Sequence, residues 1–203
     1  WHLAHSRWAL GFPDAALSAS QEALRLAEEL RHATTTGIAL WYSAVLHYQR
    51  GEGQAAAADA ERAVSMASSH GLASYIDSIM VLHHAGSDER LNIKVLADLQ
   101  RRLGSTAMSA LRRVYSLCLL ATLYGEAGDT EQGRSALASI SENSRRGFYA
   151  PEVLRIEGEL ILKSAGPGDG EAEHCFREAI ALARAREAKS FELRAATSLA
   201  RLL

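Results

Sequence analysis

Residues 154–183 read LRIEGELILKSAGPGDGEAEHCFREAIALA, and this stretch decides the fold. Its second half places small and apolar side chains three and four residues apart, the spacing of one stripe along an α-helix. The stripe consists of Ala172, Cys175, Phe176, Ala179, Ile180 and Ala183. The first half is another apolar helical pattern, and a glycine-rich segment at 166–170 separates the two. The stretch therefore predicts two packed helices joined by a turn that is too short for a domain linker.

Similar helix pairs recur along the chain. Glycines at intervals of about 35–42 residues mark a period typical of stacked helical repeats, and they are Gly11, Gly51, Gly86, Gly128 and Gly166. Segments with small residues at matching offsets follow most of them. Two such sets are Ala16, Leu17, Ser20, Ala23, Leu24 and Ala27, and then Ala56, Ala60, Ala63, Val64 and Ala67. Small side chains on one stripe let a neighbouring helix approach closely.

We therefore expect an all-α chain of about five antiparallel helix pairs and a final single helix, in one domain over residues 1–203. The expected pairs are 1–11 with 14–31, 35–50 with 54–70, 72–85 with 88–103, 107–126 with 130–146, and 149–164 with 171–187, before a helix at 190–203. Pro13 suits the first turn of a helix, and Asp129 occupies an N-cap position. The third pair fits least well, because Leu91, Val95 and Leu99 are larger than the pattern prefers.

The pairs match the tetratricopeptide pattern in several places. Leu117-x2-Leu120-Ala121-x2-Tyr124 matches its first helix, with leucine and alanine replacing the usual tryptophan and glycine. Weaker copies are Leu40-x2-Ser43-Ala44-x2-His47 and Leu154-x2-Glu157-Gly158-x2-Ile161. Ala172-x3-Phe176 followed by Ala179 matches the second helix. This resemblance implies helix pairs stacked in a right-handed superhelix.

From about Glu152 onward the chain also resembles the helical-repeat tails of large bacterial multidomain signalling proteins. The segments that carry this resemblance are 158–162, 171–179 and 188–202, and 3–11 and 40–47 are similar to the earlier repeats. In such proteins an adenylate/guanylate cyclase domain or a DNA-binding activator domain lies upstream, followed by an ATPase module. Their tail is similar to the sensor domain of maltose-type transcription activators. The resemblance departs most at 78–107, implies a role in signal transduction or transcription regulation, and carries over no catalytic residue.

Composition limits the possible functions. The formal charge of −2 gives no basic excess for neutralising nucleic-acid phosphates, so we expect no nucleic-acid partner. No apolar run reaches the ~20 residues of a membrane span, so we expect no membrane association, and we also expect no secretory leader. Cys118 and Cys175 lie in apolar helical patterns, which favours buried free thiols in a reducing cytoplasm over a disulfide. Because the chain begins at Trp1, we expect a processed protein or a piece of a longer one.

The motifs of enzymes, cofactor sites and metal sites are missing. The sequence contains no Gly-x-x-x-x-Gly-Lys-Ser/Thr loop, no His-Glu-x-x-His, no Cys-x-x-Cys and no Gly-x-Ser-x-Gly. His2 and His5 share a helix face and His83 and His84 are adjacent, but a metal site from either pair would need further ligands. We therefore expect no enzymatic activity, no cofactor and no metal.

Aromatic residues are the feature that favours binding. If the first helix of each pair lines a concave face, eleven side chains point toward it: Trp1, His5, Trp8, Trp41, Val45, Tyr48, Ile76, Met80, His84, Tyr115 and Cys118. Aromatic side chains in a groove anchor extended or helical peptides. The alternative is that Trp8, Trp41 and Tyr115 pack as core between repeats.

The leading functional hypothesis is an interaction or sensor module that binds a peptide segment, another domain of the same or a partner protein, or a small effector. The second is a structural spacer or oligomerisation arm for an upstream cyclase or ATPase domain. The third is a small-molecule sensor pocket closed by the aromatic residues. Self-association through the final helix is also expected, because its apolar stripe lacks a partner helix; the stripe is Leu193, Ala196, Leu199, Ala200 and Leu203.

Overall fold

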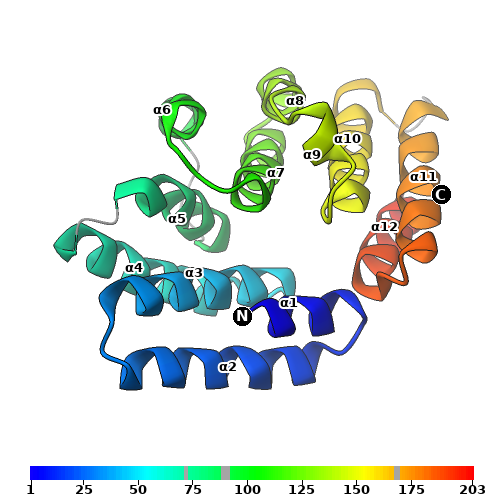
Figure 1. Cartoon of the computed structure of the whole chain (residues 1–203). Helices are drawn as coiled ribbons and strands as arrows, with labels where there is room; N and C mark the ends of the chain where they lie inside the picture. The colour runs from blue at the N-terminus through cyan, green and yellow to red at the C-terminus, as the bar shows by residue number, and fades with distance from the viewer. Residues whose placement is uncertain (71–72, 88–91, 167–169) are drawn as a thin grey trace. The chain divides into compact units, whose positions relative to one another are not determined.

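The computed structural model describes residues 1–70, 73–87, 92–166 and 170–203, and this part of the chain is built from twelve helices without a β-strand (Figure 1). The helices are α1 (His2–Ala9), α2 (Pro13–Glu29), α3 (Ala33–Gln49), α4 (Gly53–Ser69), α5 (Ala73–Gly86), α6 (Ile93–Ser105), α7 (Ala110–Glu126), α8 (Thr130–Ala138), α9 (Glu142–Arg145), α10 (Ala150–Ala165), α11 (Gly170–Ala185) and α12 (Lys189–Leu202). The predicted all-α class is confirmed. The right-handed superhelix stays a prediction.

The chain divides into two compact units. Unit 1 comprises Trp1–Arg90 and Arg101–Met108, and unit 2 comprises Leu91–Gln100 and Ser109–Leu203, so α6 contributes residues to both. The two are described separately here, and the expectation of one domain over residues 1–203 stays a prediction. No helix of the described segments is long and apolar enough to span a bilayer.

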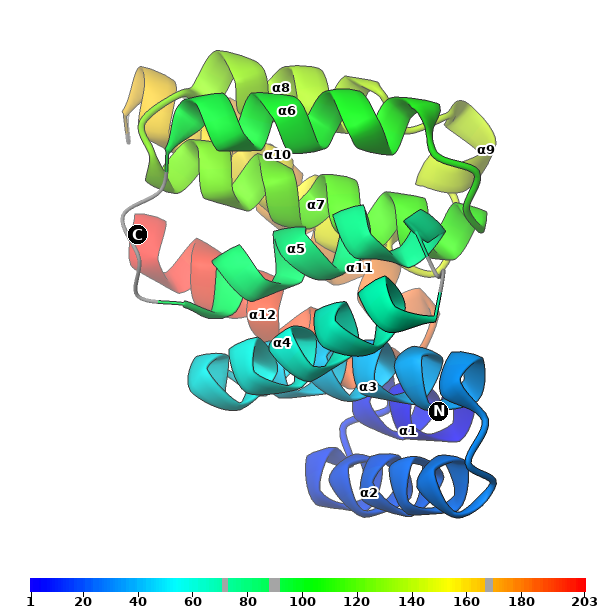
Figure 2. The ribbon, with the colours of Figure 1, turned by 90° about the vertical axis from the view of Figure 1, so that its left-hand side faces the viewer.

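In unit 1, neighbouring helices pack against one another in sequence order. Helix α2 packs on α1 and α3, while α4 packs on α3 and α5 (Figures 1 and 2). Helices α4 and α5 meet at two glycines, because a Cβ on Gly86 would lie 2.6 Å from the carbonyl oxygen of Gly53 and 3.0 Å from the amide nitrogen of Ala57. Gly86 is the last residue of α5, so the glycine marks a helix end and also allows the close contact with α4.

The turns between helices use glycine in some places and not in others. Gly11, Gly51, Gly128 and Gly166, four of the five glycines that mark the repeat period, all have positive φ values. The turns after α2 and α11 instead contain Arg31 and Glu187 in the left-handed region, with φ values of 50° and 56°. A search for glycines cannot find these turns, because arginine and glutamate adopt this conformation only where the surrounding packing requires it.

In unit 2, α10 lies between α7 and α8 on one side and α11 and α12 on the other (Figure 1). The matched repeat positions meet here, because a Cβ on Gly158 would lie 2.6 Å from Cε1 of Phe176, a fully buried ring. Around this contact lies a core of Ile161, Ala172, Cys175 and Phe176, with Leu162, Leu199 and Leu202 packed against it.

The second helix of the fourth pair is shorter than expected. We predicted one helix at 130–146, but α8 ends at Ala138 and the four-residue α9 follows. Serine is the reason: the Ser141 hydroxyl accepts a hydrogen bond from the Ser144 amide and caps α9, while Ile140 between the two helices is buried. Serine side chains compete with helical backbone bonds and favour caps. The predicted N-cap at Asp129 is confirmed, since its carboxylate accepts from the Gln132 amide at 3.1 Å.

Part of the sequence prediction lies outside the described residues. This applies to residue 72 and to 88–91 of the third pair, including Leu91, and to 167–169 of the glycine-rich turn. The described parts of the third pair are α5 and α6, and Arg102 Nη2 lies 2.6 Å from Asp77 Oδ1 between them.

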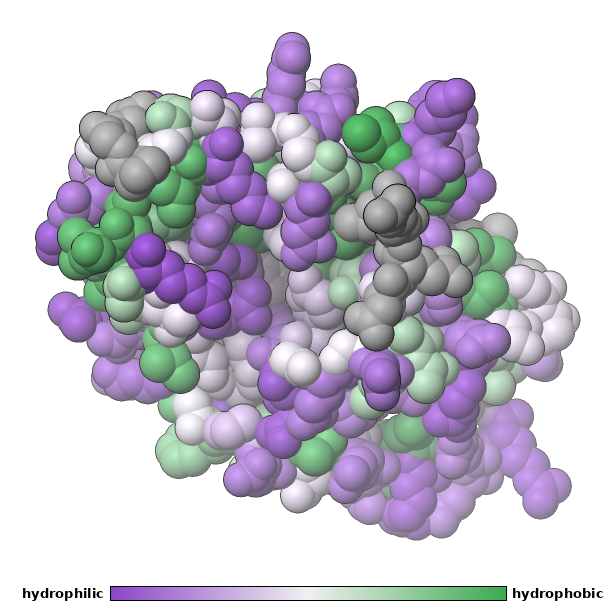
Figure 3. All heavy atoms as spheres, turned by 180° about the vertical axis from the view of Figure 1, so that it is seen from behind, coloured by the Kyte–Doolittle hydropathy of each residue, from purple (hydrophilic) through white to green (hydrophobic). Residues whose placement is uncertain are grey.

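The final helix exposes part of its apolar stripe, as expected. Leu193 and Leu203 are 69% and 82% exposed, whereas Leu199 is half-buried against the core of unit 2. On the face that Figure 3 shows, hydrophobic side chains form separate patches among hydrophilic ones. Self-association through this helix stays a prediction.

The contact between Gly158 and Phe176 generates a stability prediction. We expect Gly158→Ala to destabilise the protein by about 1–3 kcal/mol, because the added methyl group would overlap the fully buried ring of Phe176. Gly104→Ala is the matched control: Gly104 lies in α6 with nothing within 4 Å of an added Cβ, so alanine should be neutral or stabilising. Urea unfolding followed by circular dichroism measures both, and equal midpoints for the two variants would contradict the prediction.

Candidate functional site

The residues predicted to line a concave face differ widely in burial. Trp8, Trp41, Val45, Tyr115 and Cys118 are at most 5% exposed, and His5 is buried as well. Trp1, Tyr48, Ile76, Met80 and His84 are half-buried. Tyr115 and Cys118 belong to unit 2 and the others to unit 1. The tryptophan rings at positions 8 and 41 are therefore interior side chains, and a binding role for this set stays a prediction.

Tyr42, which the sequence analysis did not select, is the centre of the aromatic cluster in unit 1. The Trp1 ring stacks on it with centroids 5.6 Å apart and planes inclined by 8°. The rings of His5 and Trp41 meet it edge-on at 5.1 Å and 4.8 Å. Burial lowers the pKa of His5 to about 4, so its imidazole is neutral at pH 7. The cluster packs α1 against α3, and the missed signal was the aromatic residue directly after Trp41.

Trp41 and Tyr48 can be separated by mutation. Since Trp41 is 2% exposed, we expect Trp41→Ala to destabilise the protein by about 3–5 kcal/mol, as truncation of a buried aromatic side chain does. Tyr48→Ala should cost clearly less, because Tyr48 is half-buried. Guanidinium unfolding of the two variants measures the difference, and a Trp41→Ala protein as stable as the parent would disprove the interior assignment.

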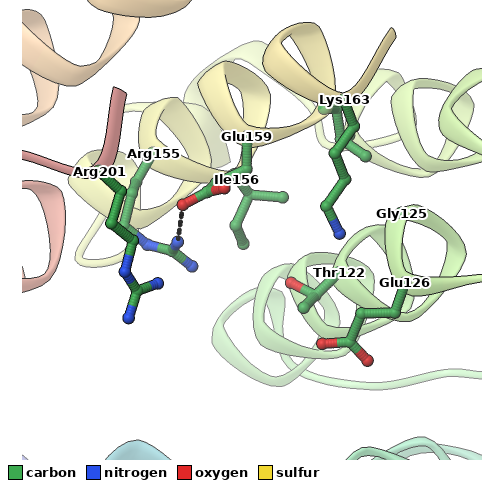
Figure 4. A pocket seen from close by; sticks show the side chains of 9 residues that line it. Thr122, Gly125, Glu126, Arg155, Ile156, Glu159, Lys163 and Arg201 are labelled. Carbon is green, nitrogen blue, oxygen red and sulfur yellow. Dashed lines mark hydrogen bonds and ion pairs between the residues drawn. The ribbon is translucent and has the colours of Figure 1, made fainter. Parts of the chain in front are cut away.

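Unit 2 contains a cavity of about 300 Å³ with charged walls, here called the α10 groove (Figure 4). Nine residues line it: Thr122, Gly125 and Glu126 from α7, Arg155, Ile156, Glu159, Leu160 and Lys163 from α10, and Arg201 from α12. Arg155, Glu159 and Lys163 are four residues apart and therefore share one face of α10. None of these nine residues is among those that the sequence analysis selected for binding.

A partly buried ion network around the buried Glu152 holds one wall of the groove. The Arg155 guanidinium donates to both carboxylate oxygens of Glu152, at 2.8 Å and 3.0 Å, and Arg194 of α12 donates to the same carboxylate at 2.8 Å. Glu159 accepts from Arg155 at 3.4 Å and from the Ser198 hydroxyl at 2.6 Å. Burial alone would raise the pKa of Glu152, but the charges of Arg155 and Arg194 and their hydrogen bonds lower it to about 2. The Arg155 side chain is thus fixed, with its charge balanced.

Three other charged side chains of the groove lack such partners. Lys163 and Arg201 are exposed, and within the described residues neither forms an ion pair. The carboxylate of Glu126 is also exposed, and it forms no ion pair with any other described residue. Figure 4 shows Arg201 beside Arg155, and Lys163 on the other side of Glu159, near Gly125. The groove therefore presents two available cations around a balanced centre.

Metal and thiol chemistry find little support in the described residues. Within them, no group of three or more histidine, cysteine, aspartate or glutamate side chains is placed to hold a metal ion. Cys118 and Cys175 are buried free thiols, as predicted, and burial raises the pKa of Cys175 to about 11.

No protein-family model, no curated protein and no solved structure matches this chain. The resemblance to regulator tails therefore stays a prediction.

The ion network should make the stability of the protein depend on pH. Because the pKa of Glu152 is lowered in the folded state, its ionised form stabilises the protein above the unfolded-state value near 4.5, and that contribution is lost as the pH falls toward about 2. Glu152→Gln should therefore cost on the order of 3 kcal/mol at pH 7, and the difference from the parent should shrink by pH 3.5. Glu131→Gln, an exposed change in the first turn of α8, should cost far less than Glu152→Gln at pH 7. Urea unfolding at both pH values checks this, and a difference independent of pH would rule out the network as its origin.

Proposed function

We propose that this chain is a non-catalytic interaction or sensor module of a bacterial signalling or transcription regulator, and that unit 2 binds its partner in the α10 groove. The observation that carries the proposal is the pair of available cations, Lys163 and Arg201, at the edge of a cavity whose wall is fixed by buried charges. Removing one member of such a network, as in Glu152→Gln, is costly because it leaves charges without compensation. The net contribution of the intact network to stability is nonetheless small, since desolvation offsets much of its Coulomb energy. Holding a binding surface in a defined geometry therefore explains the network better than stability does.

The charges of the groove differ from the paired surface charges of α11. On α11, the guanidinium groups of Arg177 and Arg184 lie 2.6 Å from the carboxylates of Glu173 and Glu192. Such pairs are already satisfied and give a ligand little to gain. Lys163 and Arg201 carry full charges into a concave surface without an internal partner, which supports a binding role at this place. The resemblance of the C-terminal segments to regulator tails supports the assignment to a regulator.

A structural spacer or oligomerisation arm is the second candidate. The exposed Leu193 and Leu203 on α12 favour it, because they offer apolar area to another chain. Under this alternative the α10 groove would have no ligand, so the two candidates differ in what the groove contacts in the cell.

Site-specific photo-crosslinking tests the proposed function. A benzoylphenylalanine in place of Glu126 lies in the groove, whereas one in place of the exposed His174 lies on α11 outside it. In cells that naturally express the protein, we expect a defined adduct from position 126 and none from position 174. The adduct should disappear in a Lys163→Glu/Arg201→Glu background, because charge reversal repels the same ligand. Absence of adducts at both positions, or the same adducts at both, would favour the spacer.

A further inference from the structure

The charges of the α10 groove indicate the chemistry of its ligand. Arg155 is balanced by Glu152 and Glu159, and Glu159 is further engaged by Ser198, so this central group attracts neither sign strongly. What remains is Lys163 on one side, Arg201 on the other, and Glu126 on α7. Two available cations outweigh one carboxylate, so the groove favours a ligand with negative charge.

The positions of the cations along α10 suit two separate negative groups. Lys163 lies eight residues after Arg155 on α10, so the backbone positions of these two residues are about 12 Å apart along the helix axis. Figure 4 shows Arg201 beside Arg155, so the two cations lie toward opposite ends of this face of α10. One carboxylate cannot reach both ends of such a span. In an extended chain, side chains four residues apart are separated by about 13 Å on the same side. An extended segment with acids at positions i and i+4 therefore matches the spacing.

The walls of the groove favour a peptide over a small molecule. Pockets for small ligands are mostly apolar and enclose most of the ligand surface. Here only Ile156 and Leu160 contribute large apolar side chains, both are buried, and Lys163 and Arg201 are exposed to solvent. A chain segment can lie across such an open surface and place its acidic side chains against the two cations.

We propose that the α10 groove binds an extended acidic peptide segment with two carboxylates four residues apart, one paired with Lys163 and one with Arg201. This inference rests on the proposed function, which places binding in the same groove. Glu126 gives the site its selectivity, since it repels any further acid on the α7 side. Removal of Glu126 should therefore tighten the binding of an acidic peptide, while removal of either cation should weaken it.

Fluorescence anisotropy with a labelled peptide tests this on the full chain. The probe is Ser-Glu-Ser-Thr-Ser-Glu-Ser, and its control has glutamine at both glutamate positions. We expect Lys163→Gln and Arg201→Gln each to weaken binding by about threefold to tenfold, and Glu126→Gln to strengthen it by about twofold. The matched controls are Arg134→Gln, which removes one positive charge, and Glu131→Gln, which removes one negative charge. Both residues are exposed on α8, and both variants should leave the affinity for the peptide unchanged. Circular dichroism melts confirm that each variant is folded.

Three outcomes would overturn the inference. The first is equal binding of the glutamine peptide, and the second is an equal loss of affinity in Arg134→Gln. The third is competition by free glutarate as effective as that of unlabelled peptide, which would identify a small dicarboxylate as the ligand. The crosslinking experiment separates this inference from the proposed function. An adduct at position 126 without acidic-peptide binding refutes only the ligand class, whereas missing adducts refute binding in the groove.

Discussion

Helices in this chain approach one another where one partner has a side chain no larger than a methyl group. Ala56, Ala60 and Ala63 of α4 are fully buried, and Gly86 and Gly158 lie where an added Cβ would collide with backbone or with a buried ring. Because protein interiors are close-packed, a small change in one helix contact affects the neighbouring contacts. The close contact of α10 and α11 at Gly158 therefore fixes the helix that also supplies most of the α10 groove.

The same constraint explains why the charges of unit 2 are arranged as they are. Once α10 is packed against α11 and α12, Glu152 is buried, and it would be strongly destabilising without compensation. Arg155 from its own helix and Arg194 from α12 provide that compensation. The ion pairs of this network involve the charges nearest the core. Lys163 and Arg201 lie farther out and form no ion pair among the described residues.

Local patterns predicted most of the fold and almost none of the candidate site. The alanine stripes, Pro13 and the Asp129 cap express preferences that act within one helix or turn, so the sequence shows them directly. The break between α8 and α9 was missed because apolar periodicity continues through Ile140. The register of Trp41 shows which face of its helix it shares, but its burial depends on the helices packed against that face, which the sequence does not show. The ion network was missed because Glu152 and Arg194 are 42 residues apart and meet only after α10 and α12 have packed.

The net charge of the chain limits how the groove can attract a ligand. With a formal charge of −2, the molecule as a whole does not attract acidic ligands at long range. Attraction at the groove must therefore come from nearby charges, and at physiological ionic strength it extends over only about 8 Å. Lys163 and Arg201 satisfy this condition only for a segment that enters the groove. A site of this kind selects its ligand by the spacing of its charges, and general electrostatic attraction contributes little.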